Sequence, residues 1–169
     1  RRWRKLQSCR PVLAMVSSRD GEEAALITAL LARKSGKGPM EFESDCPQIL
    51  VVPRHPQRIG DVASLFLAAG FSVSRRTEWR EQPSNADIWL GDTMGELALY
   101  YAMCDVALLG GSFERFGGQN LIEAAACGCP LIMGPHTYNF AQAADWAEQA
   151  GAARRTSDVQ AGLDAALDW

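Results

Sequence analysis

"DVALLGGSFERFGGQNLIEAAACGCPLIMG", residues 105–134, combines two apolar runs with a glycine-rich loop and a short helical pattern. The runs "VALL" and "LIM" have the length and composition of buried strands, and "NLIEAAAC" between them is typical of a helix. Gly128 and Pro130 predict the end of that helix, because glycine favours helix C-termini and proline cannot continue a helix. A strand, a helix and a second strand in this order indicate one unit of a parallel sheet.

The same alternation extends through the rest of the chain. Apolar runs predict strands at residues 11–18, 48–53, 71–76, 87–90, 105–111, 130–134 and 152–155. Helical spacing predicts helices at residues 20–34, 59–70, 94–104, 120–127, 139–151 and from 157 onward. Strands that are apolar throughout are buried on both faces, so we expect an α/β fold, a Rossmann-like, doubly wound parallel sheet. We expect residues 11–169 to form this single domain and residues 1–10 to be a basic linker or interdomain segment.

Composition limits the classes of protein to which the chain can belong. Its 169 residues are 47% hydrophobic and 22% charged, which is ordinary for a globular domain with its own core. The net charge of -3 disfavours broad nucleic-acid binding, and no apolar run is long enough to cross a bilayer. Because the chain has no initiating Met and opens on "RRWRKLQSCR", we expect it to be a fragment of a longer protein.

Cysteine and histidine positions argue against a zinc site. The cysteines form no CxxC pair, and neither histidine has a second ligand at metal spacing. We expect no bound metal. An odd number of scattered cysteines suits reduced thiols in the cytoplasm. These residues are Cys9, Cys46, Cys104, Cys127 and Cys129, with His55 and His136.

Polar loops follow the predicted strands. They occupy residues 17–21, 53–58, 91–96, 110–120 and 134–140. In a doubly wound sheet, ligands bind beyond the carboxyl ends of the strands, where these loops converge. We therefore predict a binding crevice at this edge of the sheet.

The loop at residues 110–120 has two interpretations. Gly117 and Gly118 allow backbone amides to approach a ligand, and the helix that follows would direct free N–H groups at a phosphate. Alternatively, Asn120 and Glu123 form a capping box that only starts the helix. Paired glycines are explained by the first interpretation and not by the second. The loop has no GxGxxG pattern, so a dinucleotide site is not indicated.

Two further loops also leave alternatives open. Arg54 can donate paired hydrogen bonds to a phosphate or a carboxylate, or it can be an ordinary surface arginine. In "GDTMGE", residues 91–96, the backbone near Met94 and Gly95 can contact the edge of a nucleotide base. The alternative is that Asp92 and Thr93 simply cap the next helix, and we favour this role for those two residues.

Several of these blocks resemble one protein family. "PRHP", "GDTMGELALYYAMCDVALLGGSF" and "GGQNLIEAAACGCPLIMGPHTYNF" are similar, in order and spacing, to the C-terminal domain of bacterial 3-deoxy-D-manno-octulosonic acid (Kdo) transferases. "SSRDGEE" is similar to the first loop of that family. The resemblance extends from about Pro11 to the end of the chain. It implies the C-terminal half of a GT-B glycosyltransferase, whose two Rossmann-like halves face each other across a cleft.

The resemblance implies a site for the donor CMP-Kdo. Glu123 would accept hydrogen bonds from the ribose, residues 117–121 would hold the phosphate with Arg54 beside it, and residues 94–96 would line the cytosine pocket. The implied donor-binding residues are Ser18, Arg54, His55, Met94, Gly95, Glu96, Ser112, Gly117, Gly118, Gln119, Asn120, Leu121 and Glu123. The family commonly has His where Gln119 stands and Pro where Ala124 stands, and Gln119 cannot carry a charge.

The resemblance also implies the activity of a longer protein. That protein would move Kdo from CMP-Kdo to a lipid A precursor at the cytoplasmic face of the bacterial inner membrane, without a cofactor. The acceptor site, the membrane anchor and the acidic catalytic base would belong to the N-terminal half, so we expect this chain to bind the nucleotide sugar without catalysing transfer. The alternatives are a GT-B donor domain for a UDP- or GDP-sugar and a non-catalytic nucleotide-binding module.

Overall fold

The computed structural model describes residues 10–35, 47–80, 83 and 85–168. Its strands are β1 (Val12–Ser18), β2 (Gln48–Pro53), β3 (Val73–Arg75), β4 (Ile88–Leu90), β5 (Val106–Leu109), β6 (Leu131–Met133) and β7 (Ala153–Arg155). Its helices are α2 (Glu22–Ser35), α3 (Ile59–Ala68), α4 (Leu97–Met103), α5 (Ile122–Ala126), α6 (Ala141–Gln149) and α7 (Val159–Leu167). Short 3-10 turns are η1 (Pro56–Arg58), η2 (Arg76–Glu78) and η3 (Tyr138–Phe140).

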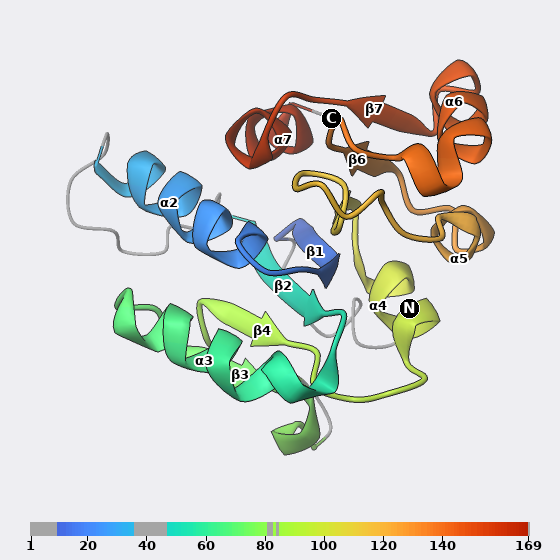
Figure 1. The fold of residues 1–169 in the computed structure, drawn as a ribbon. Helices are drawn as coiled ribbons and strands as arrows, with labels where there is room; N and C mark the ends of the chain where they lie inside the picture. Colours follow the sequence, from blue (N-terminus) through green and yellow to red (C-terminus); the bar gives the residue numbers. More distant parts are fainter. Residues whose placement is uncertain (1–9, 36–46, 81–82, 84, 169) are drawn as a thin grey trace.

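The strands form a single sheet of seven parallel strands in the order β3-β4-β2-β1-β5-β6-β7. Starting from β1, the chain builds one side of the sheet through β4 and then returns to the other side of β1 as β5 (Figure 1). The reversal between β1 and β5 is the topological switch point, where doubly wound sheets bind ligands. The predicted α/β fold with a doubly wound parallel sheet is confirmed.

Helices cover both faces of the sheet, and each face has its own apolar core. All seven residues of β1 are buried, with Leu13 and Met15 in one core and Val12, Ala14 and Val16 in the other. Helices α2, α3 and α7 pack on the first face and α4, α5 and α6 on the second (Figure 1). Burial on both sides explains why the strands are apolar without alternation.

The predicted elements are confirmed, but some of their boundaries are wrong. The predicted strand at residues 105–111 ends at Leu109, and the predicted helix at 94–104 begins only at Leu97. The predicted helix at 120–127 is reduced to the five residues of α5. Most of the predicted loop between α2 and β2, and the basic segment at the N-terminus, lie outside the described residues.

Candidate functional site

The loops at the carboxyl ends of β1 and β5 meet at the switch point. Ser17, the penultimate residue of β1, has a φ of 58°, and Gly110 follows the last residue of β5. A Cβ on Gly110 would lie 2.4 Å from the Ser17 carbonyl oxygen, so only glycine fits there. We call residues 17–23 and 110–114 the switch-point loops.

A buried carboxylate joins the two switch-point loops. Glu22 accepts hydrogen bonds from the amides of Arg19 (2.8 Å), Gly111 (2.8 Å) and Phe113 (3.1 Å), with a longer one from Glu114 (3.4 Å). Its side chain has no exposure to solvent. Burial raises the pKa of the Glu22 carboxyl above its ordinary value, and the amide hydrogen bonds oppose that rise. The first amides of the glycine loop therefore bind an anion supplied by the protein itself.

A second buried carboxylate joins the loops that follow β1 and β2. Glu23 accepts a hydrogen bond from the Ser18 hydroxyl at 2.7 Å and two from the Arg58 guanidinium, both at 2.9 Å. Arg58 also contacts Asp20 at 3.3 Å, and the hydrogen bond with Glu23 is the main cause that raises the pKa of Arg58. Ser18, an implied donor-binding residue, is thus fully buried with its hydroxyl directed at Glu23.

Ser112, another implied donor-binding residue, is equally enclosed. Its hydroxyl donates to the Leu109 carbonyl oxygen and accepts a hydrogen bond from the Gly134 amide at 2.8 Å. Its own carbonyl oxygen accepts the His136 amide at 2.9 Å. Ser112 therefore ties the loop after β5 to the loop after β6 and is buried beneath both.

Local packing requires the paired glycines, independently of any role in ligand binding. Gly117 and Gly118 have φ values of 85° and 81°. A Cβ on Gly117 would lie 2.2 Å from the side-chain nitrogen of Asn139. The backbone amide of Asn139 also donates a hydrogen bond to the Gly117 carbonyl oxygen at 3.1 Å. The amide of Gly118 is already bonded to the Gly111 carbonyl at 2.7 Å. In this structure the Gly118 amide is therefore bonded to the backbone, and the implied role of residues 117–121 in holding the phosphate stays a prediction.

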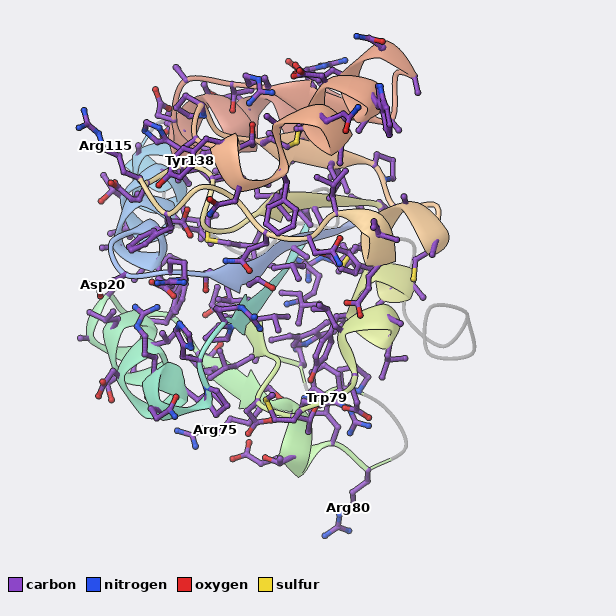
Figure 2. The ribbon with its side chains drawn as sticks, turned by 45° about the vertical axis from the view of Figure 1, so that its right-hand side comes forward. Asp20, Arg75, Trp79, Arg80, Arg115 and Tyr138 are labelled. Carbon is purple, nitrogen blue, oxygen red and sulfur yellow. The ribbon has the colours of Figure 1, made fainter. Side chains whose placement is uncertain are left out.

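Segment 137–140 holds the glycine loop from the other side. The Tyr138 hydroxyl donates to the Arg115 carbonyl at 2.8 Å, and the Asn139 side chain donates to the Phe116 carbonyl at 3.2 Å. Figure 2 shows Arg115 projecting outward near Tyr138. The Arg115 side chain is exposed although its backbone is fixed.

The start of α5 differs from the predicted capping box. Asn120 accepts the Ile122 amide at 3.0 Å and not the Glu123 amide that a capping box requires. Among the described residues Glu123 makes no side-chain hydrogen bond, and its carboxylate is exposed beside the loop. Because α5 is one and a half turns long, its dipole is a weaker source of positive potential than the predicted helix. Leu121 is buried in the core, and Gln119 lies against Gly111.

Arg19, within the switch-point loops, and Arg54, after β2, are two arginines at this edge of the sheet. Arg54 follows β2, donates its amide to the Ser18 carbonyl at 3.0 Å, and has an exposed side chain without an ion pair among the described residues. Arg19 lies over the ring of Phe116, with 4.3 Å from its guanidinium carbon to the ring centre. Sequence reasoning had identified only Arg54, although Arg19 directly follows β1. His55 is exposed and makes no cap to η1.

The segment after β4 divides into fixed and open residues. Asp92 accepts the amide and hydroxyl of Thr77 at 2.9 and 2.7 Å, so the prediction that it caps the next helix is wrong. The Thr93 hydroxyl donates to Glu96, which also pairs with Arg76 at 2.9 Å. The two residues between these contacts are open: Met94 is 73% exposed, and Gly95 has a φ of 76° and open space around it.

Among the described residues, no cluster of histidine, cysteine or acidic side chains could hold a metal ion. No helix in this part of the chain is long and apolar enough to span a membrane. Cys104, Cys127 and Cys129 form no disulfide, and the other two cysteines lie outside the described residues.

The fold and these loops define the class of the protein. It is a doubly wound α/β domain whose carboxyl edge presents exposed arginines together with exposed carboxylates, and the arginines suit phosphorylated ligands. No family model matches the chain. Curated sequences and a solved structure do.

The sequence comparisons identify the family. The chain is 48% identical, over 159 residues, to the 3-deoxy-D-manno-octulosonic acid transferase of Bordetella pertussis, covering 94% of this chain and 36% of that protein. It is 37% identical to the enzyme of the same name from Haemophilus influenzae, covering 78% of this chain and 29% of that protein. The chain belongs to the Kdo transferase family, and it spans about a third of the length of these relatives.

The structural comparison identifies the part of the family. The crystal structure of the C-terminal CMP-Kdo binding domain of WaaA from Acinetobacter baumannii matches 99% of this chain with a TM-score of 0.84 and 28% sequence identity. The match covers 82% of that domain. The predicted resemblance to the C-terminal domain of Kdo transferases is confirmed.

Proposed function

We propose that this chain is the donor-binding domain of a glycosyltransferase and binds CMP-Kdo. One observation carries the proposal: nearly the whole chain matches a domain described as binding CMP-Kdo. In the protein to which it belongs, Kdo would pass from CMP-Kdo to a lipid A precursor. The acceptor site, the membrane anchor and the catalytic base would lie in a second Rossmann-like half of a GT-B enzyme at the cytoplasmic face of the bacterial inner membrane.

The open residues of the carboxyl edge would contact the donor. Glu123 would accept hydrogen bonds from the ribose hydroxyls, and Arg54 would face the phosphate. Met94 and Gly95 would contact the cytosine edge, which their exposure allows. Gln119 would donate a hydrogen bond without titrating, since an amide has no ionised form near neutral pH.

The chemistry of transfer explains why cations are useful at this edge. As the bond between the Kdo anomeric carbon and the phosphate oxygen breaks, its electron pair goes to the phosphate and negative charge develops there. Arg19, which lies over the Phe116 ring, and Arg54, whose side chain is exposed, would place positive charge near that region and stabilise the developing anion. The acceptor hydroxyl forms the new bond and gives its proton to a base in the other half. We propose that no metal is required, because the leaving group is a phosphate monoester.

Nucleotide binding by this chain tests the proposal. Isothermal titration calorimetry with CMP and UMP is expected to show modest affinity for CMP and weaker affinity for UMP, because the segment at residues 94–95 would read the cytosine edge. Binding of CMP and UMP with equal affinity would remove that role. Tighter binding of UDP or GDP than of CMP would favour a domain for another nucleotide sugar and overturn the proposal.

Turnover provides a second test. The purified chain is expected to transfer no Kdo from CMP-Kdo to a lipid A precursor, because the proposed base lies in the other half. Measurable transfer by this chain alone would contradict that assignment.

A further inference from the structure

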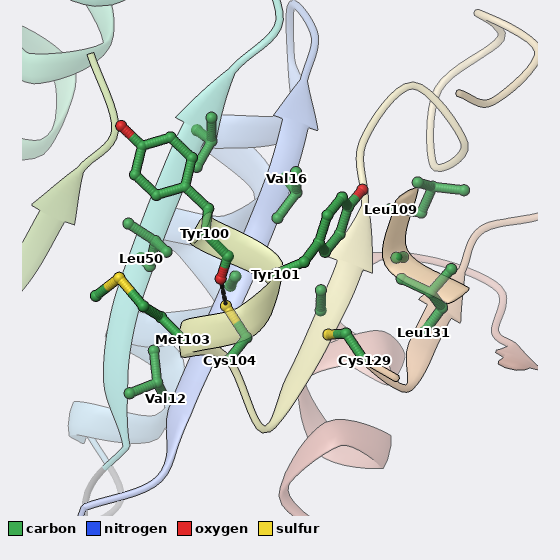
Figure 3. Close-up of a cluster of buried hydrophobic side chains, with 14 of the residues drawn as sticks. Val12, Val16, Leu50, Tyr100, Tyr101, Met103, Cys104, Leu109, Cys129 and Leu131 are labelled. Carbon is green, nitrogen blue, oxygen red and sulfur yellow. Dashed lines mark hydrogen bonds between the residues drawn. The ribbon is translucent and has the colours of Figure 1, made fainter. Parts of the chain in front are cut away.

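Helix α4 presents two adjacent buried tyrosines whose hydroxyl groups point toward the carboxyl edge of the sheet (Figure 3). Tyr100 and Tyr101 are 0% and 1% exposed. Their rings pack in the core that α4, α5 and α6 share with the sheet. Neither residue belonged to the implied donor-binding set.

The two hydroxyls differ in what they bond. The Tyr100 hydroxyl is hydrogen-bonded to the Thr93 hydroxyl. Because the Thr93 proton is donated to Glu96, Tyr100 is the donor in this pair. The first tyrosine therefore belongs to the internal network that fixes the segment after β4.

The Tyr101 hydroxyl has no such partner. No hydrogen bond joins the Tyr101 hydroxyl to any of the described residues. Its oxygen atom is also not completely enclosed by these residues, so it keeps a narrow contact with solvent. Buried tyrosine hydroxyls usually find a hydrogen-bond partner, because leaving one unmade is costly.

The surroundings of Tyr101 place its hydroxyl below the candidate site. In Figure 3 the hydroxyl lies near the carboxyl end of β5, level with Leu109. Tyr101 belongs to the same apolar core as Leu121 and Ala124, the residues on either side of Ile122 and Glu123 at the start of α5. Burial raises the pKa of Tyr101 well above its ordinary value, and nearby groups that include the Glu123 carboxylate contribute to the rise. The hydroxyl therefore stays protonated and can only be a neutral donor or acceptor.

We propose that the Tyr101 hydroxyl is a ligand-binding group that donates a hydrogen bond to an oxygen atom of the bound nucleotide, next to Glu123. This inference rests on the proposed function and adds a buried residue of α4 to the exposed residues that would contact the donor. The acceptor is a ribose oxygen or a phosphate oxygen of the same nucleotide. A ribose hydroxyl that donates to Glu123 still has free lone pairs, so a neutral donor beside the carboxylate would complete its hydrogen bonding.

The test is Tyr101→Phe, which removes one oxygen atom and keeps the ring in the core. Calorimetry with CMP and with cytidine is expected to show a loss in affinity of about fivefold to tenfold, as for a hydrogen bond made only in the complex. A loss for both ligands identifies the ribose, and a loss for CMP alone identifies the phosphate. The melting temperature of the free protein is expected not to fall, because its hydroxyl makes no internal bond.

Tyr100→Phe is the matched control for stability. It removes a hydroxyl that is bonded to Thr93, so its melting temperature is expected to fall below that of Tyr101→Phe. If Tyr101→Phe binds CMP and cytidine like the wild type, the ligand-binding role is overturned, whether or not the protein melts earlier. If the wild type itself binds no nucleotide, the proposed function fails, and the role of Tyr101 fails with it.

Discussion

The carboxyl edge of the sheet has an inner and an outer region that differ in how their polar groups are used. The inner region consists of the switch-point loops, where Glu22 and Glu23 are fully buried. Glu22 accepts hydrogen bonds from backbone amides, and Glu23 accepts them from Ser18 and Arg58. The outer region, which we call the outer rim, consists of Arg54, Met94, Gly95 and Glu123. These residues are exposed, and among the described residues the side chains of Arg54 and Glu123 make no ion pair or hydrogen bond.

This difference changes how the site is understood. A glycine loop at a switch point usually binds an anion through its backbone amides. Here some of these amides already donate hydrogen bonds to the carboxylate of Glu22. An internal anion fixes the amides before any ligand arrives, at the cost of removing them from ligand binding. The inner region therefore sets the geometry, and under the proposed function the outer rim would contact the nucleotide.

The largest expected effect on stability comes from removing the internal anion. Glu22→Ala leaves buried amides of both switch-point loops without an acceptor, and each such group costs roughly 1–3 kcal/mol. We expect the free energy of unfolding to fall by about 3 kcal/mol or more in urea denaturation. Glu114→Ala, an exposed residue on the same loop, is the control and should change stability little. Equal small effects in the two variants would contradict the role of Glu22 as an internal anion for these amides.

A smaller loss is expected when the second carboxylate loses its cation. Arg58→Met leaves Glu23 buried without its charged partner, and breaking a buried pair costs roughly 3–5 kcal/mol. Arg58 is partly exposed, with 21% of its side chain accessible, so water reduces the effect. We expect about 2 kcal/mol in the same assay. The double variant Arg58→Met/Glu23→Gln should recover part of this loss, and a purely additive double variant would show that the pair is not coupled.

Ser112→Ala is expected to cost roughly 1–2 kcal/mol, because the Gly134 amide and the Leu109 carbonyl lose the hydroxyl that joins them. Thermal unfolding measures this loss. CMP affinity should change less than about threefold, since the hydroxyl is enclosed. A large fall in affinity with unchanged melting would return Ser112 to the donor-binding set.

The smallest effect is expected at a helix cap outside both regions. Asp158 accepts the Ala161 amide at 2.8 Å at the start of α7, and this hydrogen bond is the main cause that lowers its pKa. Asp158→Ala should cost about 1 kcal/mol at neutral pH. Because the folded pKa is lowered, the contribution is present above the unfolded value of 3.8 and is lost as the pH falls through the folded pKa. Urea denaturation at neutral and acidic pH tests this, and a cost that grows on acidification would contradict it.

The fold was largely predictable, and the reason is burial. Strands such as β1 and β2 are covered on both faces, so their sequences are apolar throughout, and the helices between them keep their periodicity. The predicted boundaries of helices and strands were wrong where the local sequence signals were ambiguous. Met94 and Gly95 were included in the predicted helix, but Gly95 has a φ of 76°, which is not helical, and α4 begins only at Leu97.

The candidate site was predictable only in part. Loop positions followed from the strand ends, so the exposed position of Arg54 at the carboxyl edge was predictable, and Arg19 could have been identified by the same rule. Glu123 came from the family resemblance, and its role in donor binding, like that of Arg54, stays a prediction. Nothing local in the sequence distinguishes a buried Glu22 from a solvated helix residue, because its partners lie about 90 residues away in the chain. The bond between the Ser112 hydroxyl and the Gly134 amide also joins two different loops, whereas Glu23, the partner of Ser18, is a near neighbour in the chain.

The paired variants Glu123→Ala and Ser112→Ala test the division between the two regions most directly. For each, the melting temperature and the CMP dissociation constant are measured under identical conditions. We predict that Glu123→Ala melts like the wild type and binds CMP about tenfold more weakly, as for the loss of a charge-assisted hydrogen bond. Ser112→Ala should show the reverse pattern. If Glu123→Ala melts early yet binds CMP like the wild type, its carboxylate serves the helix and not the nucleotide, and the division is contradicted.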